Sequence, residues 1–276
     1  MKRVLVCHND DQRLEAMIDT LKQQHHVEIV RDTIYLKTKL LNGSYDYLII
    51  PITGIDESLT IRGSSIKLPE ECLEHLKDTT ILTGLIHPFL KETCDRYHIK
   101  LVSYLTEDFA IGNNYLTTEG VIERLVQLSS KAIYQSHILI VGYGKLGQVL
   151  SKVLSAFKAN LTIVARDPKD LTKIKIDGHK PITYDDLEAI IGHYDFVITT
   201  VPSPVLHDDE LSMLAKSQAI VLDVSSAPYS FDLKKALSLN VQAYRLPQIP
   251  AKVAPDTAGM LMANEILGLI GGSIND

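Results

Sequence analysis

Short apolar segments alternate with amphipathic ones along the chain, and this alternation predicts strands and helices in turn. Apolar or β-branched runs predict strands at residues 3–8, 27–30, 47–51, 80–83 and 100–103. Apolar residues recur with the three-to-four-residue spacing of a helix face at residues 11–23, 33–41 and 69–76. Because strands and helices alternate, the first half is predicted to be an α/β domain with a parallel sheet and right-handed crossovers.

The second half continues the same alternation and opens with a strand–helix–strand unit at residues 137–167. Buried parallel strands are also predicted at residues 196–200, 219–223 and 242–246. Helices are predicted at residues 208–214, 230–239 and 258–270. The second half is therefore expected to be a doubly wound parallel sheet.

The segment between the two halves predicts the domain boundaries. Residues 118–134 have the apolar spacing of one long helix, with Thr118 as a possible N-cap. We expect a first α/β domain over residues 1–116, a connecting helix over 117–135 and a second domain, with the C-terminal helix, over 136–276. Residues 53–67 are polar, contain two glycines and are expected to form a long loop, for which function, a small hairpin and disorder stay open.

Three glycines follow the strand that opens the second half, with the spacing G-x-G-x-x-G. Gly142 permits a tight turn, Gly144 lets a pyrophosphate approach the backbone, and Gly147 lets the next helix pack closely. The pyrophosphate would lie at the helix N-terminus, where unpaired N–H groups favour an anion. In this context the motif predicts a dinucleotide site in a Rossmann domain. The expected cofactor contacts are Gly142, Tyr143, Gly144, Lys145, Leu146, Gly147, Arg166, Val201, Pro202 and Ser203.

The end of the second strand in this unit indicates which nucleotide is bound. A carboxylate there usually accepts the ribose 2′-OH of NAD, whereas a nearby Arg accommodates the 2′-phosphate of NADP. The sequence here is Ala165-Arg166-Asp167, with alanine where the carboxylate is expected. The chain is therefore predicted to bind NADP through Arg166. The alternative is a solvated Arg166 with Asp167 as the ribose ligand.

Polar residues at predicted strand ends are the candidates for chemistry, because ligands of an open parallel sheet lie outside the carboxyl ends of its strands. The catalytic candidates are Lys252, His87, Ser225 and Ser226. The substrate-binding candidates are Thr53, Ser203, Ser225 and Lys252. Each has a simpler alternative: a helix cap for His87, an exposed lysine for Lys252, and caps or turns for the hydroxyl residues.

Composition narrows the possible partners. The net charge is −6 and the Lys and Arg residues form no long block, which argues against nucleic acid. No apolar run is long enough to span a bilayer and no signal peptide is evident, so we expect a cytoplasmic protein without membrane contact. Cys7, Cys72 and Cys94 lack ligand or C-x-x-C spacing, so free thiols and no metal site are expected.

Several segments resemble the dipicolinate synthase A-subunit family, in the same order and over nearly the whole chain. They are LTTEGVI, VGYGKLG, TTVPSPVL, VLDVSSAP and VAPDTAGMLMANEIL. The resemblance implies a flavodoxin-like first domain and a Rossmann second domain, similar in architecture to the D-2-hydroxyacid dehydrogenases. It also implies NADP-dependent oxidation of a small dihydrodipicolinate-type dicarboxylate to pyridine-2,6-dicarboxylate in spore-forming bacteria, on a branch of the lysine and diaminopimelate pathway. A separate, flavoprotein-like B subunit is implied as partner, and a homo-oligomer is expected.

The chain departs from this family's pattern at two places where substrate is expected. Tyr229-Ser230-Phe231 replaces a glycine-rich stretch, and Gln248-Ile249-Pro250-Ala251 replaces a Gly-Leu-Pro-Gly-like segment. Two other functions stay open. A D-2-hydroxyacid dehydrogenase would share the fold, although the sequence shows no His–carboxylate pair for that chemistry. A non-catalytic NADP-binding regulatory protein would keep the glycine motif without an acid–base pair.

Overall fold

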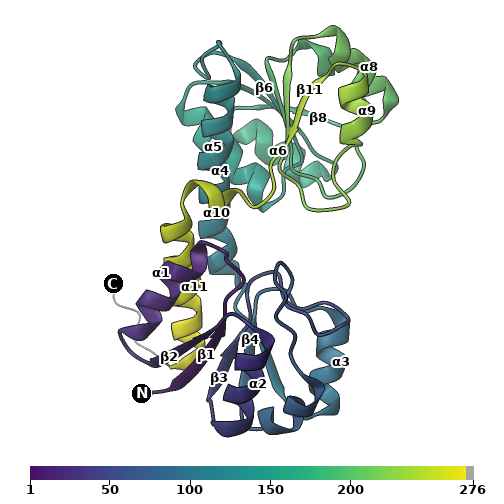
Figure 1. Cartoon of the computed structure of the whole chain (residues 1–276). Coiled ribbons are helices and arrows are strands. Elements are labelled where there is room, and N and C mark those ends of the chain that lie inside the picture. The colour runs from purple at the N-terminus through teal and green to yellow at the C-terminus, as the bar shows by residue number, and fades with distance from the viewer. Residues whose placement is uncertain (272–276) are drawn as a thin grey trace. The chain divides into compact units, whose positions relative to one another are not determined.

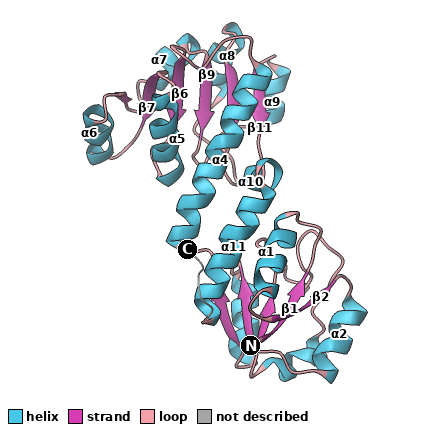
Figure 2. Cartoon of the chain, turned by 90° about the vertical axis from the view of Figure 1, so that its left-hand side faces the viewer, coloured by secondary structure: helices cyan, strands magenta, loops and turns pink. Residues whose placement is uncertain are grey.

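The computed structural model describes residues 1–271, and the chain folds into two compact units. Within the described residues, unit 1 comprises Met1–Asn113 together with residues 254–271, and unit 2 comprises Asn114–Val253. Each unit is a parallel sheet covered by helices (Figure 1, Figure 2). In the described part of the chain, no helix has the length and apolar character needed to cross a bilayer.

Unit 1 is built on a five-stranded parallel sheet. Its strands are β1 (Arg3–Cys7), β2 (His26–Val30), β3 (Tyr47–Ile49), β4 (Thr80–Thr83) and β5 (Lys100–Ser103). Its helices are α1 (Arg13–Lys22), α2 (Thr33–Asn42), the 3-10 helix η1 (Glu70–Leu76), α3 (Pro88–Arg96), the first part of α4 (Glu107–Leu128) and α11 (Pro255–Ile270). The strand order β2-β1-β3-β4-β5 is the flavodoxin-like order, which confirms the prediction.

The last helix, α11, belongs to unit 1, so its expected place in the second domain is wrong. It packs against α1, and Met262, Ala263 and Ile266 lie in the same core cluster as residues of β1 and α1. Gly259 makes the close approach possible, because an added Cβ there would overlap the carbonyl oxygen of Arg13. The contact joins the two ends of the chain, which no local pattern reveals.

The polar segment at residues 53–67 forms an ordered loop rather than an open one. Ile55 pairs with Ile61 and Thr60 with Lys67 through single antiparallel bridges. Ile55, Ile61 and Ile66 are buried in the core of unit 1. The small-hairpin alternative therefore describes this segment best.

Unit 2 is a six-stranded parallel sheet. Its strands are β6 (His137–Val141), β7 (Asn160–Val164), β8 (Lys180–Ile182), β9 (Phe196–Thr199), β10 (Ile220–Asp223) and β11 (Gln242–Arg245). Its helices are the rest of α4, α5 (Lys145–Ala156), α6 (Pro168–Ile176), α7 (Leu187–Ile190), the 3-10 helix η2 (Ile191–His193), α8 (Asp208–Lys216), α9 (Leu233–Ser238) and α10 (Ile249–Val253). The order β8-β7-β6-β9-β10-β11 is that of a Rossmann fold, as predicted.

The connecting helix begins earlier than the sequence suggested. α4 starts at Glu107, and the division between the units falls inside it, after Asn113. Thr118 is therefore not an N-cap: it is buried within the helix and its hydroxyl donates to the carbonyl oxygen of Asn114 at 2.9 Å. Acidic residues Glu107 and Asp108 occupy the first turn, where they favour helix initiation.

Candidate dinucleotide site

The three glycines after β6 have different surroundings. Gly142 has a φ of +105°, and an added Cβ would lie 2.6 Å from Thr200 Oγ1. A Cβ on Gly147 would overlap the carbonyl oxygen of Gly142, so the first turn of α5 packs tightly on the strand end. A Cβ on Gly144, at the N-cap of α5, would meet no atom within 4 Å. The second glycine therefore leaves open space in front of the helix N-terminus, where a phosphate can approach.

A groove of about 380 Å³ opens in front of this turn. It is lined by Gly142, Tyr143, Gly144, Lys145, Leu146, Ala165, Arg166, Asp167, Asp170, Tyr184, Thr200, Val201 and Pro202. The structure thus brings most of the predicted cofactor residues to one groove. Gly147 packs beneath the turn, and Ser203 is exposed outside the lining.

The segment after β7 separates Arg166 from its acidic neighbour. Ala165 is buried, whereas Arg166 is exposed at the groove. Asp167 is the N-cap of α6, and its Oδ1 accepts the backbone N–H of Lys169 at 2.8 Å. One carboxylate oxygen of Asp167 is therefore engaged in capping, which weakens the alternative that Asp167 is the ribose ligand.

Tyr143 lines the groove, but the residue is almost fully buried. Its side chain is 5% exposed and packs in the core, and its hydroxyl donates to Asp177 Oδ2 at 2.9 Å. Burial, with the neighbouring Asp177 carboxylate, raises the pKa of Tyr143 to about 12. The side chain anchors the turn to the domain and has no exposed hydroxyl to offer a ligand.

A buried carboxylate organises the strand end next to the groove, at β10. Asp223 is fully buried, and its Oδ1 accepts the hydroxyl of Ser225 at 2.6 Å, the N–H of Ser225 at 3.0 Å and the hydroxyl of Thr199 at 3.2 Å. Arg245 Nε lies 3.4 Å from Oδ2. The Ser225 hydroxyl is therefore held by a carboxylate, which suits positioning of this loop better than proton transfer.

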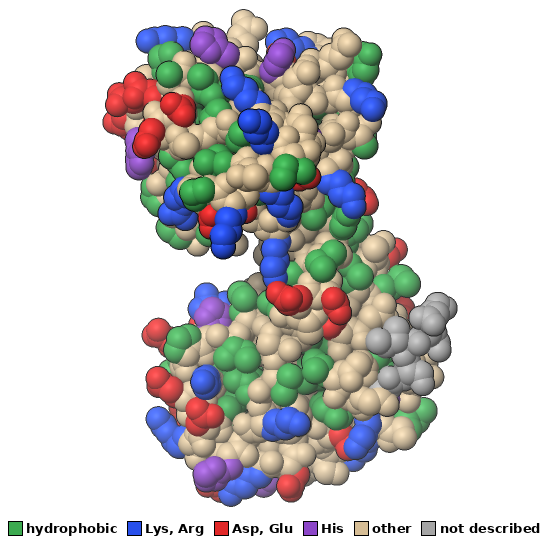
Figure 3. Space-filling view, turned by 180° about the vertical axis from the view of Figure 1, so that it is seen from behind, with side chains coloured by type: hydrophobic (Ala, Val, Ile, Leu, Met, Phe, Trp, Pro, Cys, Tyr) green, Lys and Arg blue, Asp and Glu red, His purple; other side chains and the backbone are tan. Residues whose placement is uncertain are grey.

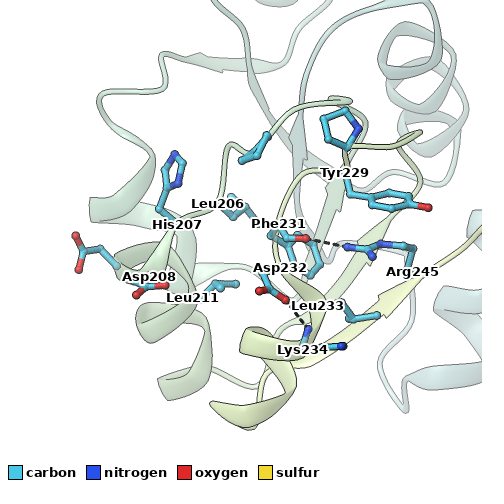
Figure 4. A pocket seen from close by; sticks show the side chains of 13 residues that line it. Leu206, His207, Asp208, Leu211, Tyr229, Phe231, Asp232, Leu233, Lys234 and Arg245 are labelled. Atoms are coloured by element: carbon cyan, nitrogen blue, oxygen red, sulfur yellow. Dashed lines mark hydrogen bonds between the residues drawn. The ribbon is translucent and has the colours of Figure 1, made fainter.

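Arg245 is held on three sides beside this carboxylate. Its Nη2 donates to the carbonyl oxygen of Phe231 at 2.8 Å, and the guanidinium lies 3.7 Å from the centre of the Tyr229 ring. Figure 4 shows the ring over the guanidinium. Both side chains line a wider cavity of about 790 Å³. The sequence analysis did not identify Asp223 and Arg245 as candidate site residues. The available signal was an Asp ending an otherwise apolar strand.

Both departures from the family pattern fall at left-handed backbone positions. Tyr229 has a φ of +72° and Gln248 a φ of +56°. Glycine adopts this conformation without steric cost, whereas a side chain strains it by roughly 1–2 kcal/mol. The contact between Tyr229 and Arg245 is a compensating interaction at the first of these positions.

The remaining candidates fall into separate groups. In unit 1, His87 Nε2 lies 3.4 Å from the carbonyl oxygen of Thr53, and the Thr53 hydroxyl donates to the carbonyl of Arg62 at 3.2 Å. His87 occupies the N-cap position of α3 but its side chain makes no cap hydrogen bond, so the side-chain capping alternative is wrong. In unit 2, Ser226 is exposed after β10 and Lys252 is exposed on α10.

A His–carboxylate pair exists that the sequence did not reveal. His8, at the end of β1, has its Nε2 3.1 Å from Glu15 Oε1. Its Nδ1 faces Arg31 Nη1 at 2.9 Å and accepts the N–H of Asp10 at 3.1 Å. Burial and the Arg31 charge lower the pKa of His8. The β1–α1 turn brings His8 and Glu15 together, which residue spacing alone did not indicate.

Cysteines and surface charge add two observations. Cys7, Cys72 and Cys94 are free and buried, and burial raises the pKa of Cys7 and Cys94 to about 12. The structure of residues 1–271 contains no cluster of three or more His, Cys, Asp or Glu side chains that could bind a metal ion. On the face drawn in Figure 3, both units carry Lys and Arg as well as Asp and Glu side chains.

Comparison with known proteins adds two family models and several relatives. Residues 10–105 match the model of the N-terminal domain of the dipicolinate synthase A subunit, and residues 124–249 match that of shikimate/quinate 5-dehydrogenase. The dipicolinate synthase A subunit of Bacillus subtilis is 29% identical over 82% of this chain and 77% of its own length. A crystal structure of the A chain from Bacillus subtilis has a TM-score of 0.82 at 25% identity, covering 97% of this chain and 95% of its own. The A-subunit structure from Bacillus halodurans has a TM-score of 0.84 at 23% identity, covering 99% and 98%.

The matches agree over both units. The N-terminal model covers most of unit 1, and the A-subunit relatives extend over both. These matches confirm the resemblance of the chain to the dipicolinate synthase A-subunit family. Its relatives and the dehydrogenase model on unit 2 support an oxidoreductase role.

Proposed function

We propose that this relative of the dipicolinate synthase A subunits is an NADP-dependent dehydrogenase. Its proposed substrate is a dihydrodipicolinate-type dicarboxylate and its product is pyridine-2,6-dicarboxylate. The observation that carries the proposal is the open glycine turn of unit 2, with Gly144 facing empty space and Arg166 exposed at the same groove. That groove belongs to a chain whose relatives include named dipicolinate synthase A subunits.

The groove fits a dinucleotide phosphate at two points. The backbone N–H groups at the start of α5 face the open space at Gly144, where pyrophosphate oxygens would accept their hydrogen bonds. The exposed Arg166 guanidinium offers charge-assisted hydrogen bonds to a 2′-phosphate. The buried Ala165 offers no acceptor to a ribose hydroxyl, so this edge favours NADP over NAD.

The proposed reaction does not require a covalent bond between the protein and the substrate. A bound NADP would supply the hydride acceptor for this oxidation, and the ring of the dihydro substrate would also lose one proton as it becomes aromatic. Since aromatic stabilisation supplies much of the driving force, the chain's own task is to orient the ring, bind two carboxylates and accept that proton. The Asp223–Ser225 hydrogen bond fixes the β10 loop next to the groove for this purpose.

The family name also supports a partner. The relatives are named as A subunits, so we propose that this chain acts with a separate, flavoprotein-like B subunit in the cytoplasm of a spore-forming bacterium. Homo-oligomerisation is part of the same proposal.

The test is turnover with product identification. The full chain is mixed with NADP⁺ and enzymatically generated dihydrodipicolinate, with and without the B subunit, and NADPH and pyridine-2,6-dicarboxylate are quantified. We expect the two products in equal amounts. Nucleotide binding without turnover, with the B subunit present, would instead indicate a regulatory protein. Turnover with a 2-hydroxy acid and none with the dihydro compound would make the chain a D-2-hydroxyacid dehydrogenase.

A further inference from the structure

A separate cavity of unit 2, about 330 Å³ in volume, lies between α4 and α10; we call it the α4–α10 pocket. Arg124 lines it from α4 and Lys252 from α10. Leu246, Ile249 and Val253 supply apolar lining. Both ribbon views place α10 beside α4 (Figure 1, Figure 2). The volume is at the lower end of the range for small-molecule sites, so it suits a ligand of one ring.

Close contact between the two helices gives the pocket an apolar base. Gly120 of α4 faces α10, and a Cβ there would overlap Ile249 Cγ2 and lie 3.0 Å from Val253 Cγ1. Any larger residue at position 120 would push α10 away. The absence of a side chain on Gly120 therefore keeps Ile249 and Val253 against α4.

The two cations of this pocket have no carboxylate partner among residues 1–271. Arg124 Nη1 donates to the side-chain oxygen of Gln127 at 2.9 Å, which is a neutral acceptor. The carboxylate of Glu123, also in the lining, instead accepts the amide of Gln127 at 2.8 Å. Lys252 is exposed and forms no ion pair or side-chain hydrogen bond in the described part of the chain. Arg245 also borders the pocket, but buried Asp223 offsets its charge.

We propose that the α4–α10 pocket binds a planar ring dicarboxylate, with Arg124 and Lys252 as the anion-binding side chains and the ring against Ile249 and Val253. The proposal rests on the proposed function and names the site of its substrate class. Two cations offset the hydration that a dianion loses on binding, and the apolar base accepts the face of the ring. The pocket shares no lining residue with the nucleotide groove, so dicarboxylate binding and NADP binding are tested by separate variants.

The test measures binding without turnover. Pyridine-2,6-dicarboxylate is titrated calorimetrically into the full chain with saturating NADP⁺, and pyridine-2-carboxylate serves as the probe with one carboxylate. Arg124→Gln and Lys252→Gln are each expected to weaken dicarboxylate binding about ten- to hundredfold, the range of a charge-assisted bond. Lys252→Arg is expected to recover most of the affinity. Arg96→Gln, which removes an exposed charge in α3 of unit 1, is the matched control and should bind as the parent does.

The outcomes separate this site from the proposed function. The proposed site would be refuted if both glutamine variants kept the parental dicarboxylate affinity, or if Arg96→Gln lost as much affinity as they do. It would also be refuted if the parent bound the monocarboxylate equally well, or did not bind the dicarboxylate. If Arg124→Gln and Lys252→Gln both turn over substrate with the parental KM, the proposed function is supported and the proposed site is refuted. Dicarboxylate binding that depends on both cations, without turnover, would support the site and refute the function. The NADP affinity of each variant is expected to stay within about twofold of the parent, because neither residue lines the nucleotide groove.

Discussion

The turn after the first strand differs sharply between the two units, although both sheets are doubly wound and parallel. In unit 1, β1 is followed by side chains that fill the strand end. His8 is buried against Glu15 and Arg31, and Asn9 Nδ2 donates to the carbonyl of Arg62 at 2.9 Å. In unit 2, β6 is followed by Gly142 and Gly144, and the corresponding space is open.

Both turns need a left-handed residue, yet they obtain it differently. Asp10 has a φ of +61° in unit 1 and Gly142 a φ of +105° in unit 2. Aspartate tolerates this conformation and keeps a side chain, whereas glycine also clears the space in front of the following helix. Topology alone therefore does not create an anion site. The site requires a turn whose side chains are absent, so that backbone N–H groups face the ligand.

The contrast between the open and the filled turn requires that a side chain added to the open turn weakens nucleotide binding. Gly144→Val places a branched side chain where the pyrophosphate must approach, and we expect NADP affinity to fall at least about a hundredfold, or 2.7 kcal/mol. Because a Cβ at this N-cap meets no protein atom, folding should lose only about 1 kcal/mol. Fluorescence titration with NADPH measures the first effect and thermal unfolding the second. A folded variant with parental affinity would mean that the turn is purely structural.

Arg166 is the next test, because it is a charged side chain that the open groove leaves exposed. We expect Arg166→Ala to weaken NADP binding by about 1.5–3 kcal/mol, through loss of a charge-assisted hydrogen bond. NAD binding should change little, since NAD lacks the 2′-phosphate. Parallel titrations of parent and variant with both nucleotides give the comparison. Equal losses for both, or a parent that prefers NAD, would remove Arg166 as the basis of NADP selection.

Gly147 and Gly144 belong to the same motif but are expected to have different roles. Its missing side chain serves packing, because a Cβ would overlap the carbonyl oxygen of Gly142. Gly147→Ala is therefore expected to lower the free energy of unfolding by about 1–3 kcal/mol through overpacking. Gly144→Ala should cost less than about 1 kcal/mol, since its Cβ meets nothing. Denaturant unfolding of the two alanine variants compares them, and equal losses would contradict the assigned roles.

The filled turn of unit 1 predicts the smallest effect, a dependence of stability on pH. Burial lowers the pKa of His8 below its unfolded value of about 6.5. Its contribution is therefore fully present above about pH 6.5 and declines as the pH falls below that value, because the unfolded chain takes up the proton first. His25 and His179 shift in the same direction. We expect His8→Gln to lose less stability than the parent on acidification, measured by thermal unfolding; an identical pH dependence would refute this.

Much of the fold was accessible from the sequence because its strands are short apolar runs with clear ends. The predicted strands at residues 80–83 and 100–103 match β4 and β5 at both ends. The glycine spacing likewise led to the groove, because a motif of this kind specifies backbone geometry locally. The start of α4 at Glu107 was not evident, because Gly112, Asn113 and Asn114 are weak helix formers and interrupt the helical pattern before residue 118.

What the sequence could not supply were contacts between distant segments. Asp223 and Arg245 meet because β10 and β11 pair in register, with these two residues opposite each other. His8 and Glu15 meet across a turn whose geometry depends on Asp10. Candidates chosen one at a time at strand ends, such as Ser203 and Ser226, proved exposed, because a strand-end position does not define where a side chain points.

The placement of α11 in unit 1 has a consequence for how the protein is made on the ribosome. Unit 2, residues Asn114–Val253, is synthesised entirely between the two parts of unit 1. At about 5–20 residues per second, roughly 7–28 s pass between completing the first part and starting the second. During that time the apolar face of α1, including Met17 and Leu21, lacks the helix that covers it. The domain that begins first in the chain is therefore the one that finishes last, and its nascent form is the species most in need of chaperone protection.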